Sequence, residues 1–218
     1  MTVLLLQKIR WITACLILTC SSSLFAASDG SAVRIGVMLF DGVLTSDVMA
    51  PMEVFGSAIA SGAVDNYELV TIAREAGTII TQEGVTLTAE YSIGSRYGMD
   101  AVLDDEPFMD FIRDRGSRAD WLASNCSGAY ILAEAGFLNG VKATTYPGGE
   151  VWLNLNHPAI DIEINETVVV DGNIITSNGS LVSYEAALEL LGQMAGEDAA
   201  EEIADLIYFN RLLERGTT

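Results

Sequence analysis

Apolar and polar residues follow two patterns along the chain, one typical of buried strands and the other typical of helices. Nearly continuous apolar runs predict strands that are covered on both faces of a sheet. Such runs lie at 33–40, 67–73, 99–103, 121–123 and 143–146. Apolar residues at intervals of three and four predict helices. These intervals occur at 47–59, 107–115, 129–135, 184–194 and 199–213.

Residues that favour helix ends and tight turns mark the boundaries of these elements. Ser46 or Asp47 is expected to cap the first helix, and acidic residues at 104–106 favour the start of the next one. Two hairpins are expected, one from 79–80 with 85–87 at a sheet edge and one from 167–170 with 173–176 around the turn Asp171-Gly172.

Helices that alternate with apolar strands predict an α/β fold, with helices on both faces of a mostly parallel sheet. The chain shows no internal repeat or low-complexity linker, so a single domain is expected over residues 33–215. Ligands of such folds bind beside the C-terminal ends of the strands. Cys126 and the loop after Phe40 both fall at such ends.

The segment SNCSG at 124–128 joins a predicted strand to a predicted helix. A nucleophile on a sharp strand-to-helix turn needs small residues two positions before and after it, and Ser124 and Gly128 meet that need. Such a turn aims the first helix amides at the sulfur of Cys126, which favours the thiolate and leaves donors for an oxyanion. The alternative is a buried structural cysteine.

The first 26 residues have the layout of a secretory signal peptide. Lys8 and Arg10 precede an apolar run at 11–18, and small residues follow. The run is short for a membrane span, although an uncleaved anchor and lipidation at Cys20 are alternatives. We therefore expect a periplasmic or secreted protein in which Cys126 is the only remaining cysteine and has no internal disulfide partner.

The charge balance of the chain is strongly acidic. Eleven basic and 30 acidic residues give a net charge of −19, and loss of Lys8 and Arg10 with the signal peptide would leave 9 − 30 = −21. Such a charge argues against nucleic acid and against anionic membrane surfaces as partners.

Four stretches resemble the ThiJ/PfpI superfamily: IGVMLFDGVLTSDVMAPMEVF, ASNCSGAYILAEAGFLNG, KATTYP and DGNIITSNGSLVSYEAALEL. The resemblance implies a flavodoxin-like three-layer sandwich related to class I glutamine amidotransferases. Its members include the Parkinson-associated deglycase, PfpI-type proteases and isonitrile hydratases. It also implies that Cys126 is the reactive residue, that Asp47 contacts it, and that the backbone amide of Ser127, with that of Gly128, helps to hold an oxyanion.

A carboxylate beside this cysteine has a chemical use. A thiol and a carboxyl group that share a proton can add a nucleophile to a substrate and then protonate the adduct. The alternative for Asp47 is a helix cap. Glu53, six positions further on, would face away from Asp47 and is expected to be solvated.

The chain departs from the superfamily at two places. Many relatives have histidine where this chain has Tyr146, so a Cys–His protease is not expected, and Tyr146 is left as a substrate-binding hydrogen-bond donor. The Pro-Gly-Gly loop that follows the strand at 99–103 in relatives is replaced here by Asp104-Asp105. One histidine, His157, and one mature cysteine give no recognisable metal site, and no cofactor is expected.

The sequence leaves three functions open. The first is a cysteine-dependent hydratase or hydrolase that acts on a small electrophilic substrate, with Cys126 as nucleophile and Asp47 as acid and base. The second is a redox-sensing or binding module without turnover. The third, a DNA-binding regulator, is disfavoured by the acidic, exported character of the chain and by its end soon after the last helix. A homodimer is also expected, through the apolar stripe Ile203, Leu206, Ile207 and Leu213, unless that stripe packs on its own protomer.

Overall fold

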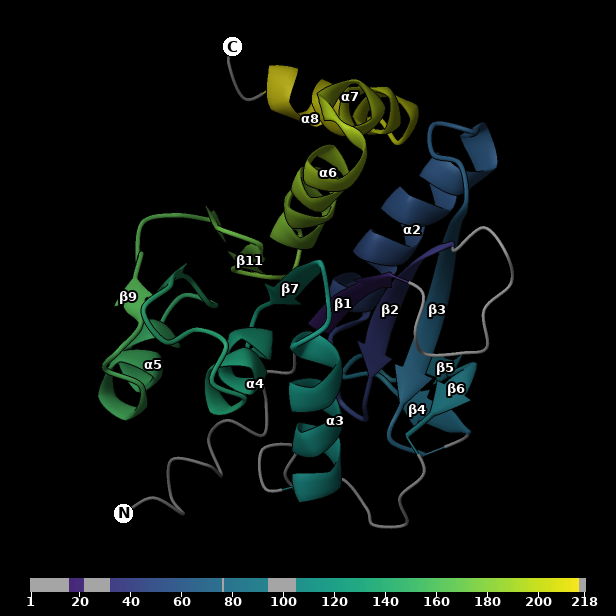
Figure 1. Ribbon diagram of the computed structural model, residues 1–218. Helices are drawn as coiled ribbons and strands as arrows, with labels where there is room; N and C mark the ends of the chain where they lie inside the picture. Colours follow the sequence, from purple (N-terminus) through teal and green to yellow (C-terminus); the bar gives the residue numbers. More distant parts are fainter. Residues whose placement is uncertain (1–15, 22–31, 76, 94–104, 216–218) are drawn as a thin grey trace.

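The structure is a computed structural model that describes residues 16–21, 32–75, 77–93 and 105–215. A seven-stranded sheet with the order β10-β11-β7-β1-β2-β3-β6 forms its centre (Figure 1). Its strands are β1 (Leu16–Ser21), β2 (Val33–Leu39), β3 (Tyr67–Ala73), β6 (Tyr91–Ser92), β7 (Trp121–Asn125), β10 (Val168–Asp171) and β11 (Ile174–Ser177). Five of the seven strands run in one direction, while β1 and β10 run in the other. The expected α/β sandwich with a largely parallel sheet is confirmed.

Strand β1 bridges the two halves of the sheet. It pairs antiparallel with β2, with Leu16 opposite Met38 and Ser21 opposite Val33. It also pairs antiparallel with β7, with Leu16 opposite Ser124 and Thr19 opposite Trp121. This strand falls within the first 26 residues, for which the sequence predicts a signal peptide. That cleavage stays a prediction, and it would remove the strand between β2 and β7.

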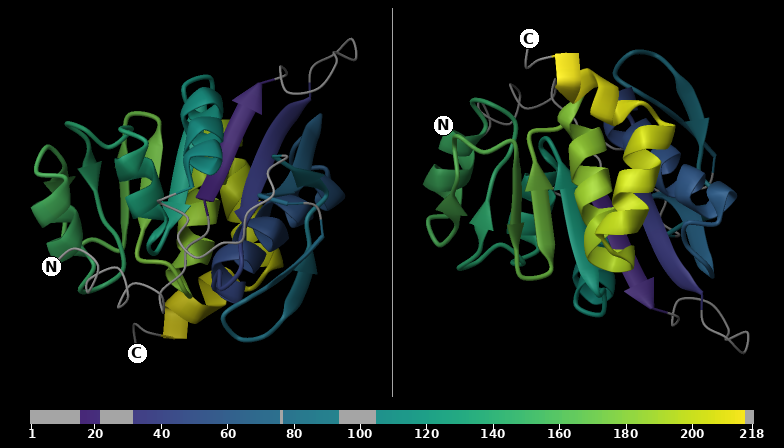
Figure 2. Two further views of the ribbon diagram at one scale, coloured as in Figure 1. Left: turned by 90° about the horizontal axis from the view of Figure 1, so that it is seen from below. Right: turned by 90° about the horizontal axis from the view of Figure 1, so that it is seen from above.

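Helices cover both faces of the sheet (Figure 2). One face carries α2 (Thr45–Ser61) and α6 (Val182–Ala195), which contact each other, with α7 (Glu197–Leu206) against both and α8 (Phe209–Arg215) against α7. The other face carries α3 (Glu106–Gly116) and α4 (Gly128–Glu134). Outside the main sheet lie α5 (Glu150–Asn156) and the two small sheets made by β4 (Thr78–Ile80) with β5 (Thr86–Thr88) and by β8 (Lys142–Ala143) with β9 (Asp161–Ile162).

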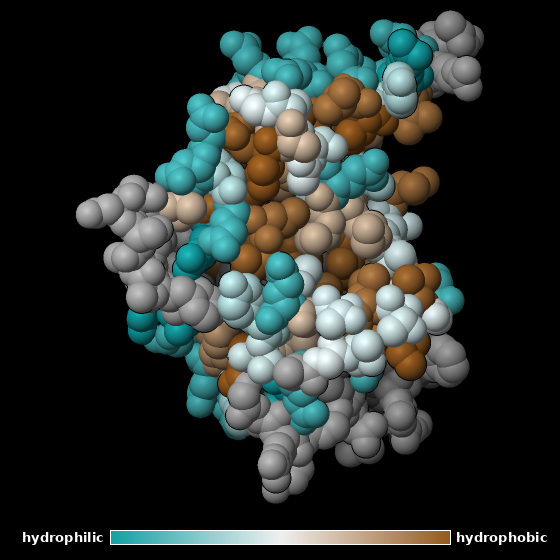
Figure 3. Space-filling view, turned by 90° about the vertical axis from the view of Figure 1, so that its right-hand side faces the viewer, coloured by the Kyte–Doolittle hydropathy of each residue, from teal (hydrophilic) through white to brown (hydrophobic). Residues whose placement is uncertain are grey.

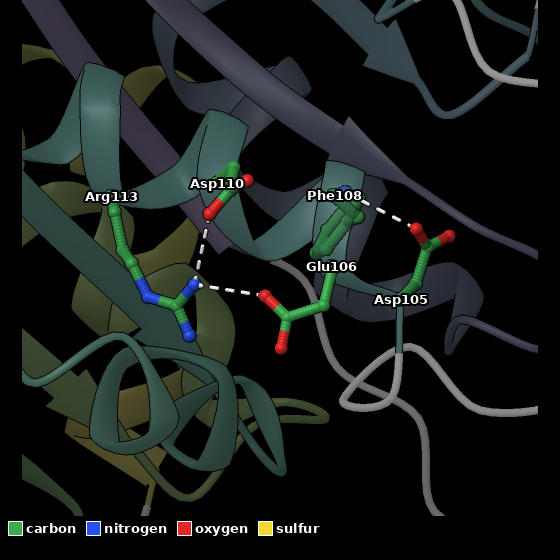
Figure 4. Close-up of polar contacts among 5 residues, drawn as sticks. All are labelled: Asp105, Glu106, Phe108, Asp110 and Arg113. Atoms are coloured by element: carbon green, nitrogen blue, oxygen red, sulfur yellow. Dashed lines mark hydrogen bonds and ion pairs between the residues drawn. The ribbon is translucent and has the colours of Figure 1, made fainter.

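Helix α3 begins where the sequence predicts. Asp105 is its N-cap and accepts a hydrogen bond from the backbone amide of Phe108 at 3.2 Å, while Arg113 pairs with Glu106 and Asp110 on the exposed face (Figure 4). The opposite face of the helix is apolar and buried, with Phe108, Met109 and Ile112. The capping residue, the acidic first turn and the apolar stripe therefore all predict the helix that the structure shows.

Several expected elements differ from the observed ones. The last helix is interrupted between α7 and α8, because Tyr208 adopts a left-handed backbone with φ 63°. The strand expected at 143–146 is replaced by the two-residue β8, after which the backbone amide of Thr144 donates to the side-chain hydroxyl of Thr176 instead of to a backbone carbonyl. The helix α5 was not predicted, and the strand expected at 99–103 lies outside the described residues.

The apolar stripe at the end of the chain is only partly free. Ile203 is fully buried and Ile207 packs against the core, whereas Leu206 and Leu213 are 54% and 59% exposed. Half of the stripe thus stabilises its own protomer, and the homodimer stays a prediction. Figure 3 shows apolar patches among hydrophilic ones on one face of the molecule. Other exposed large apolar residues include Met49 and Ile80.

Candidate active site

Cys126 occupies a strained turn between β7 and α4. Its φ is 53°, in a region that non-glycine residues seldom adopt, and its side chain is 3% exposed. The amide of Cys126 donates to the carbonyl of Ser177 at 3.0 Å, and its own carbonyl accepts from the hydroxyl of Thr145 at 2.7 Å. The expected nucleophile elbow is therefore present, held on one side by the end of β11 and on the other by Thr145.

Ser127 provides donors for the sulfur. Its amide and its hydroxyl both hydrogen-bond to Cys126 and lower the pKa of the thiol. Gly128 follows as the first residue of α4. The Ser127 amide, which is expected to stabilise an anionic adduct, therefore donates a hydrogen bond to Cys126.

Asp47 lies in the first turn of α2 and does not cap it, because the N-cap is Leu44 and makes no side-chain hydrogen bond. The side chain of Asp47 is fully buried. Its Oδ1 accepts from the backbone amide of Ser180 at 2.7 Å and from the hydroxyl of Ser183 at 2.8 Å. Helix α2 is tied to the elbow as well, since Asn125 donates its Nδ2 to the backbone carbonyl of Asp47 at 3.3 Å.

Burial shifts the pKa of both candidate catalytic groups, and the charge of Asp47 also acts on Cys126. Burial raises the pKa of Asp47 to about 6, against the hydrogen bonds from Ser183 and Ser180, and the charge of Glu83 adds a smaller increase. Burial, and then the charge of Asp47, raise the pKa of the Cys126 thiol to about 12. At neutral pH the pair therefore holds one proton, on sulfur, with Asp47 ionised.

This protonation differs from the one expected from the elbow, which favours a thiolate. The helix amides do act in the expected direction, but desolvation of the buried sulfur and the adjacent carboxylate outweigh them. Cys126 is thus a neutral thiol at neutral pH.

Tyr146 lies half-buried near the sulfur, in an aromatic group that the sequence did not reveal. Its hydroxyl shares a hydrogen bond with that of Tyr130, and ionisation of Cys126 would raise the pKa of both phenols. The two rings meet edge to face with centroids 5.8 Å apart, and Trp152 packs on Tyr130 at 4.5 Å. Burial raises the pKa of both tyrosines, so they remain neutral hydrogen-bonding groups.

Glu53 and His157, which the sequence also singled out, have partners other than Cys126 and Asp47. Glu53 is exposed and accepts from the hydroxyl of Tyr184 at 2.6 Å. His157 is half-buried, with Nε2 3.2 Å from Glu134 and its ring against Trp152. In the described part of the chain, no three His, Cys, Asp or Glu side chains gather as a metal site, and no helix there is long and apolar enough to cross a membrane.

Three residues beside the pair were missed by sequence reasoning: Thr145, Gly179 and Ser183. Each belongs to a stretch that resembles the superfamily, but nothing in its local pattern assigns it a role. Gly179 lies so close to Cys126 that a β-carbon there would come within 2.4 Å of the cysteine Cβ. The position that holds a Pro-Gly-Gly loop in relatives lies partly outside the described residues.

A comparison with known protein families decides where the chain belongs. The model of the DJ-1/PfpI family matches residues 33–193, which include Asp47, Cys126 and Ser183. The chain belongs to the DJ-1/PfpI family. The superfamily resemblance read from the four sequence stretches is confirmed.

Individual members of the DJ-1/PfpI family show how far the similarity extends. An isonitrile hydratase of Pseudomonas putida is 28% identical over 176 residues, 78% of this chain and 75% of that protein. Drosophila melanogaster dj-1beta is 32% identical over 111 residues, 51% of this chain and 58% of that protein.

Two solved structures share the fold. A ThiJ/PfpI family protein from Pseudomonas syringae superimposes with a TM-score of 0.68 at 22% identity, over 85% of this chain and 82% of that one. Oxidized Toxoplasma gondii DJ-1 superimposes with a TM-score of 0.67 at 20% identity, over 81% of this chain and 98% of that one.

Proposed function

We propose that this DJ-1/PfpI protein is a cysteine-dependent enzyme that adds water to a small electrophile, with an isonitrile as the first candidate substrate. The observation that carries the proposal is that Cys126 and Asp47 are both buried and that the charge of Asp47 helps to keep the proton on the sulfur of Cys126. The similarity to an isonitrile hydratase over three quarters of that protein supports this substrate class.

The first half of the reaction uses Asp47 as a base. Its carboxylate takes the thiol proton while the sulfur of Cys126 attacks the terminal carbon of R–N≡C. The protonated carboxyl group then delivers that proton to the same carbon, which gives a thioimidate, R–N=CH–S–Cys. The amide and hydroxyl of Ser127 stabilise the negative charge on sulfur as the proton leaves.

The second half consumes water. Water adds to the thioimidate carbon while Asp47 takes one of its protons, and the nitrogen gains a proton from the same group to give R–NH–CH(OH)–S–Cys. Collapse of this intermediate forms the C=O bond and breaks the C–S bond. The hydroxyl proton returns through Asp47 to the sulfur, so that the formamide R–NH–CHO leaves and the enzyme is regenerated.

Proteolysis is a poor alternative for this site. Tyr146 stands where many relatives carry histidine, and a neutral phenol with a raised pKa is a weak base at neutral pH. A redox-sensing module is the second candidate function. The burial and raised pKa of Cys126 disfavour it, because sensor cysteines react as exposed, low-pKa thiolates.

Export belongs to the same proposal and rests on the sequence of the first 26 residues. An exported hydratase would act on small molecules in the periplasm or outside the cell and would meet neither nucleic acid nor a membrane as partner.

Turnover of small electrophiles tests the proposed activity. Wild type is expected to hydrate isonitriles, or to convert glyoxal-type carbonyls, and both Cys126→Ala and Asp47→Asn are expected to lose at least a hundredfold in rate, because each removes a reacting group. Glu53→Gln is the matched control, since Glu53 lies on the same helix as Asp47 but is exposed. A wild type that turns over nothing while its thiol oxidises reversibly would favour the sensor.

A further inference from the structure

The two carboxylate oxygens of Asp47 have different surroundings. Oδ1 accepts two hydrogen bonds, from the Ser180 amide at 2.7 Å and from the Ser183 hydroxyl at 2.8 Å. Oδ2 is buried and has no hydrogen-bond partner among the described residues. This asymmetry raises the free energy of the ionised group, because a buried acceptor without a partner has lost its hydrogen bonds to water and gained none in return. It therefore indicates that Oδ2 has a role in function.

The two donors come from one loop and the helix that follows it. Ser180 lies between β11 and α6 with φ 58°, directly after Gly179 with φ 81°, and Ser183 lies in the first turn of α6. These backbone conformations turn the amide of Ser180 toward α2. The same loop touches the nucleophile, because Gly179 packs against Cys126. One loop therefore contacts both members of the pair.

We propose that Ser183 is a positioning residue that, together with the Ser180 amide, holds Asp47 by Oδ1 and leaves Oδ2 as the atom that exchanges a proton with Cys126. This inference rests on the proposed function and deepens it. A backbone amide can only donate, so the lone pair of Oδ1 that faces Ser180 cannot carry the proton. The proton moves to the oxygen that has no donor.

The same hydrogen bonds tune the acidity of Asp47. Burial and the charge of Glu83 raise the pKa of Asp47, whereas the hydrogen bonds from Ser183 and Ser180 lower it. The charge of Asp47 in turn raises the pKa of the Cys126 thiol. Loss of the Ser183 hydroxyl removes the largest of the lowering contributions. The carboxyl group would then titrate at higher pH and would act as a base over a narrower range.

The test follows the titration of the Asp47 carboxyl carbon by NMR in the full chain, which does not require turnover. Ser183→Ala is expected to raise the midpoint by about one pH unit, the effect of one hydrogen bond to a charged acceptor. The acid limb of the turnover profile should move in the same direction. Ser183→Thr keeps the hydroxyl and is expected to restore the wild-type midpoint.

Two control variants isolate the effect of the hydroxyl. Tyr184→Phe removes a hydrogen bond from the adjacent residue of α6 to Glu53 on α2, and Ser180→Gly keeps the amide donor while removing the side chain. Neither should move the Asp47 midpoint. An unchanged midpoint in Ser183→Ala, or an equal shift in Tyr184→Phe, would overturn the positioning role even if the enzyme turns over isonitriles. A shifted midpoint in a protein without turnover would support it while the proposed function fails.

Discussion

Gly179 lies directly against Cys126, so that a β-carbon built on the glycine would come within 2.4 Å of the Cβ of the cysteine. The glycine also has φ 81°, which side chains disfavour. Gly179→Ala is therefore expected to destabilise the protein by about 2–4 kcal/mol, because backbone strain and a clash add together. It should also displace the elbow and reduce turnover.

Gly172→Ala separates the two causes. Gly172 has φ 60° but open space around its Cα, so its substitution should cost only the conformational part, about 1 kcal/mol, and leave the activity unchanged. Urea unfolding of both variants measures the difference. Equal destabilisation would mean that the close approach of Gly179 to Cys126 carries no energy.

Asp47→Asn is expected to change how stability depends on pH. Because the folded pKa of Asp47 is raised from 3.8 to about 6, the native state binds its proton more tightly than the unfolded state does. The resulting stabilisation is present at pH 4 and is lost as the pH rises through 6. Relative to wild type, Asp47→Asn should thus gain roughly 2 kcal/mol between pH 4 and pH 8. Denaturant unfolding at both pH values measures this gain, with Glu53→Gln as the control that should show none.

The reactivity of Cys126 is expected to respond to the same substitution. The ionised Asp47 carboxylate raises the pKa of the thiol, so its removal should lower that pKa and speed alkylation by iodoacetamide at pH 8. Wild-type protein should react more slowly than free cysteine, whose pKa is about 8.5. Fast alkylation of wild type, unchanged in Asp47→Asn, would contradict the protonation assigned to the pair.

The start of the mature protein is a further prediction. The intact mass of exported protein should correspond to a chain that begins near Ala27. A full-length membrane-held species would indicate an anchor, and a lipid adduct at Cys20 would indicate a lipoprotein.

Hydrogen exchange then shows what the loss of β1 does to the sheet. Because β1 pairs with both β2 and β7, amides on those two strands should exchange faster in a chain of residues 27–218 than in the full-length chain. Equal protection in the two chains would show that β1 is not needed to close the sheet.

Much of the fold could be predicted from the local pattern of apolar and polar residues, because burial determines that pattern. The predicted strand at 67–73 coincides with β3, and the apolar run at 33–40 with β2, since both are covered on two faces. The positions at which a helix is interrupted were harder to predict. The left-handed backbone at Tyr208, which divides the last predicted helix, leaves no mark in the periodicity of its apolar residues.

The candidate site could be predicted only in part, for a related reason. The small residues around Cys126 mark the elbow, and the family stretches single out Asp47. The donors to Asp47, Ser180 and Ser183, lie 133 and 136 residues away in the chain, and no local pattern connects such distant positions. The charge state of Cys126 depends on tertiary burial, which raises the pKa of the thiol and favours the neutral form over the thiolate expected from the sequence.

The most direct measurement of the central claim is the intact mass of the protein after rapid mixing with an isonitrile and acid quench. The proposed reaction predicts a transient adduct that adds the mass of one isonitrile at Cys126 in wild type and is absent from Cys126→Ala. Asp47→Asn should form the adduct far more slowly, because no carboxyl group then delivers a proton to the isonitrile carbon, a step that alkylation does not need. Formamide production without any adduct at Cys126, or an adduct that forms equally fast in Asp47→Asn, would contradict the account.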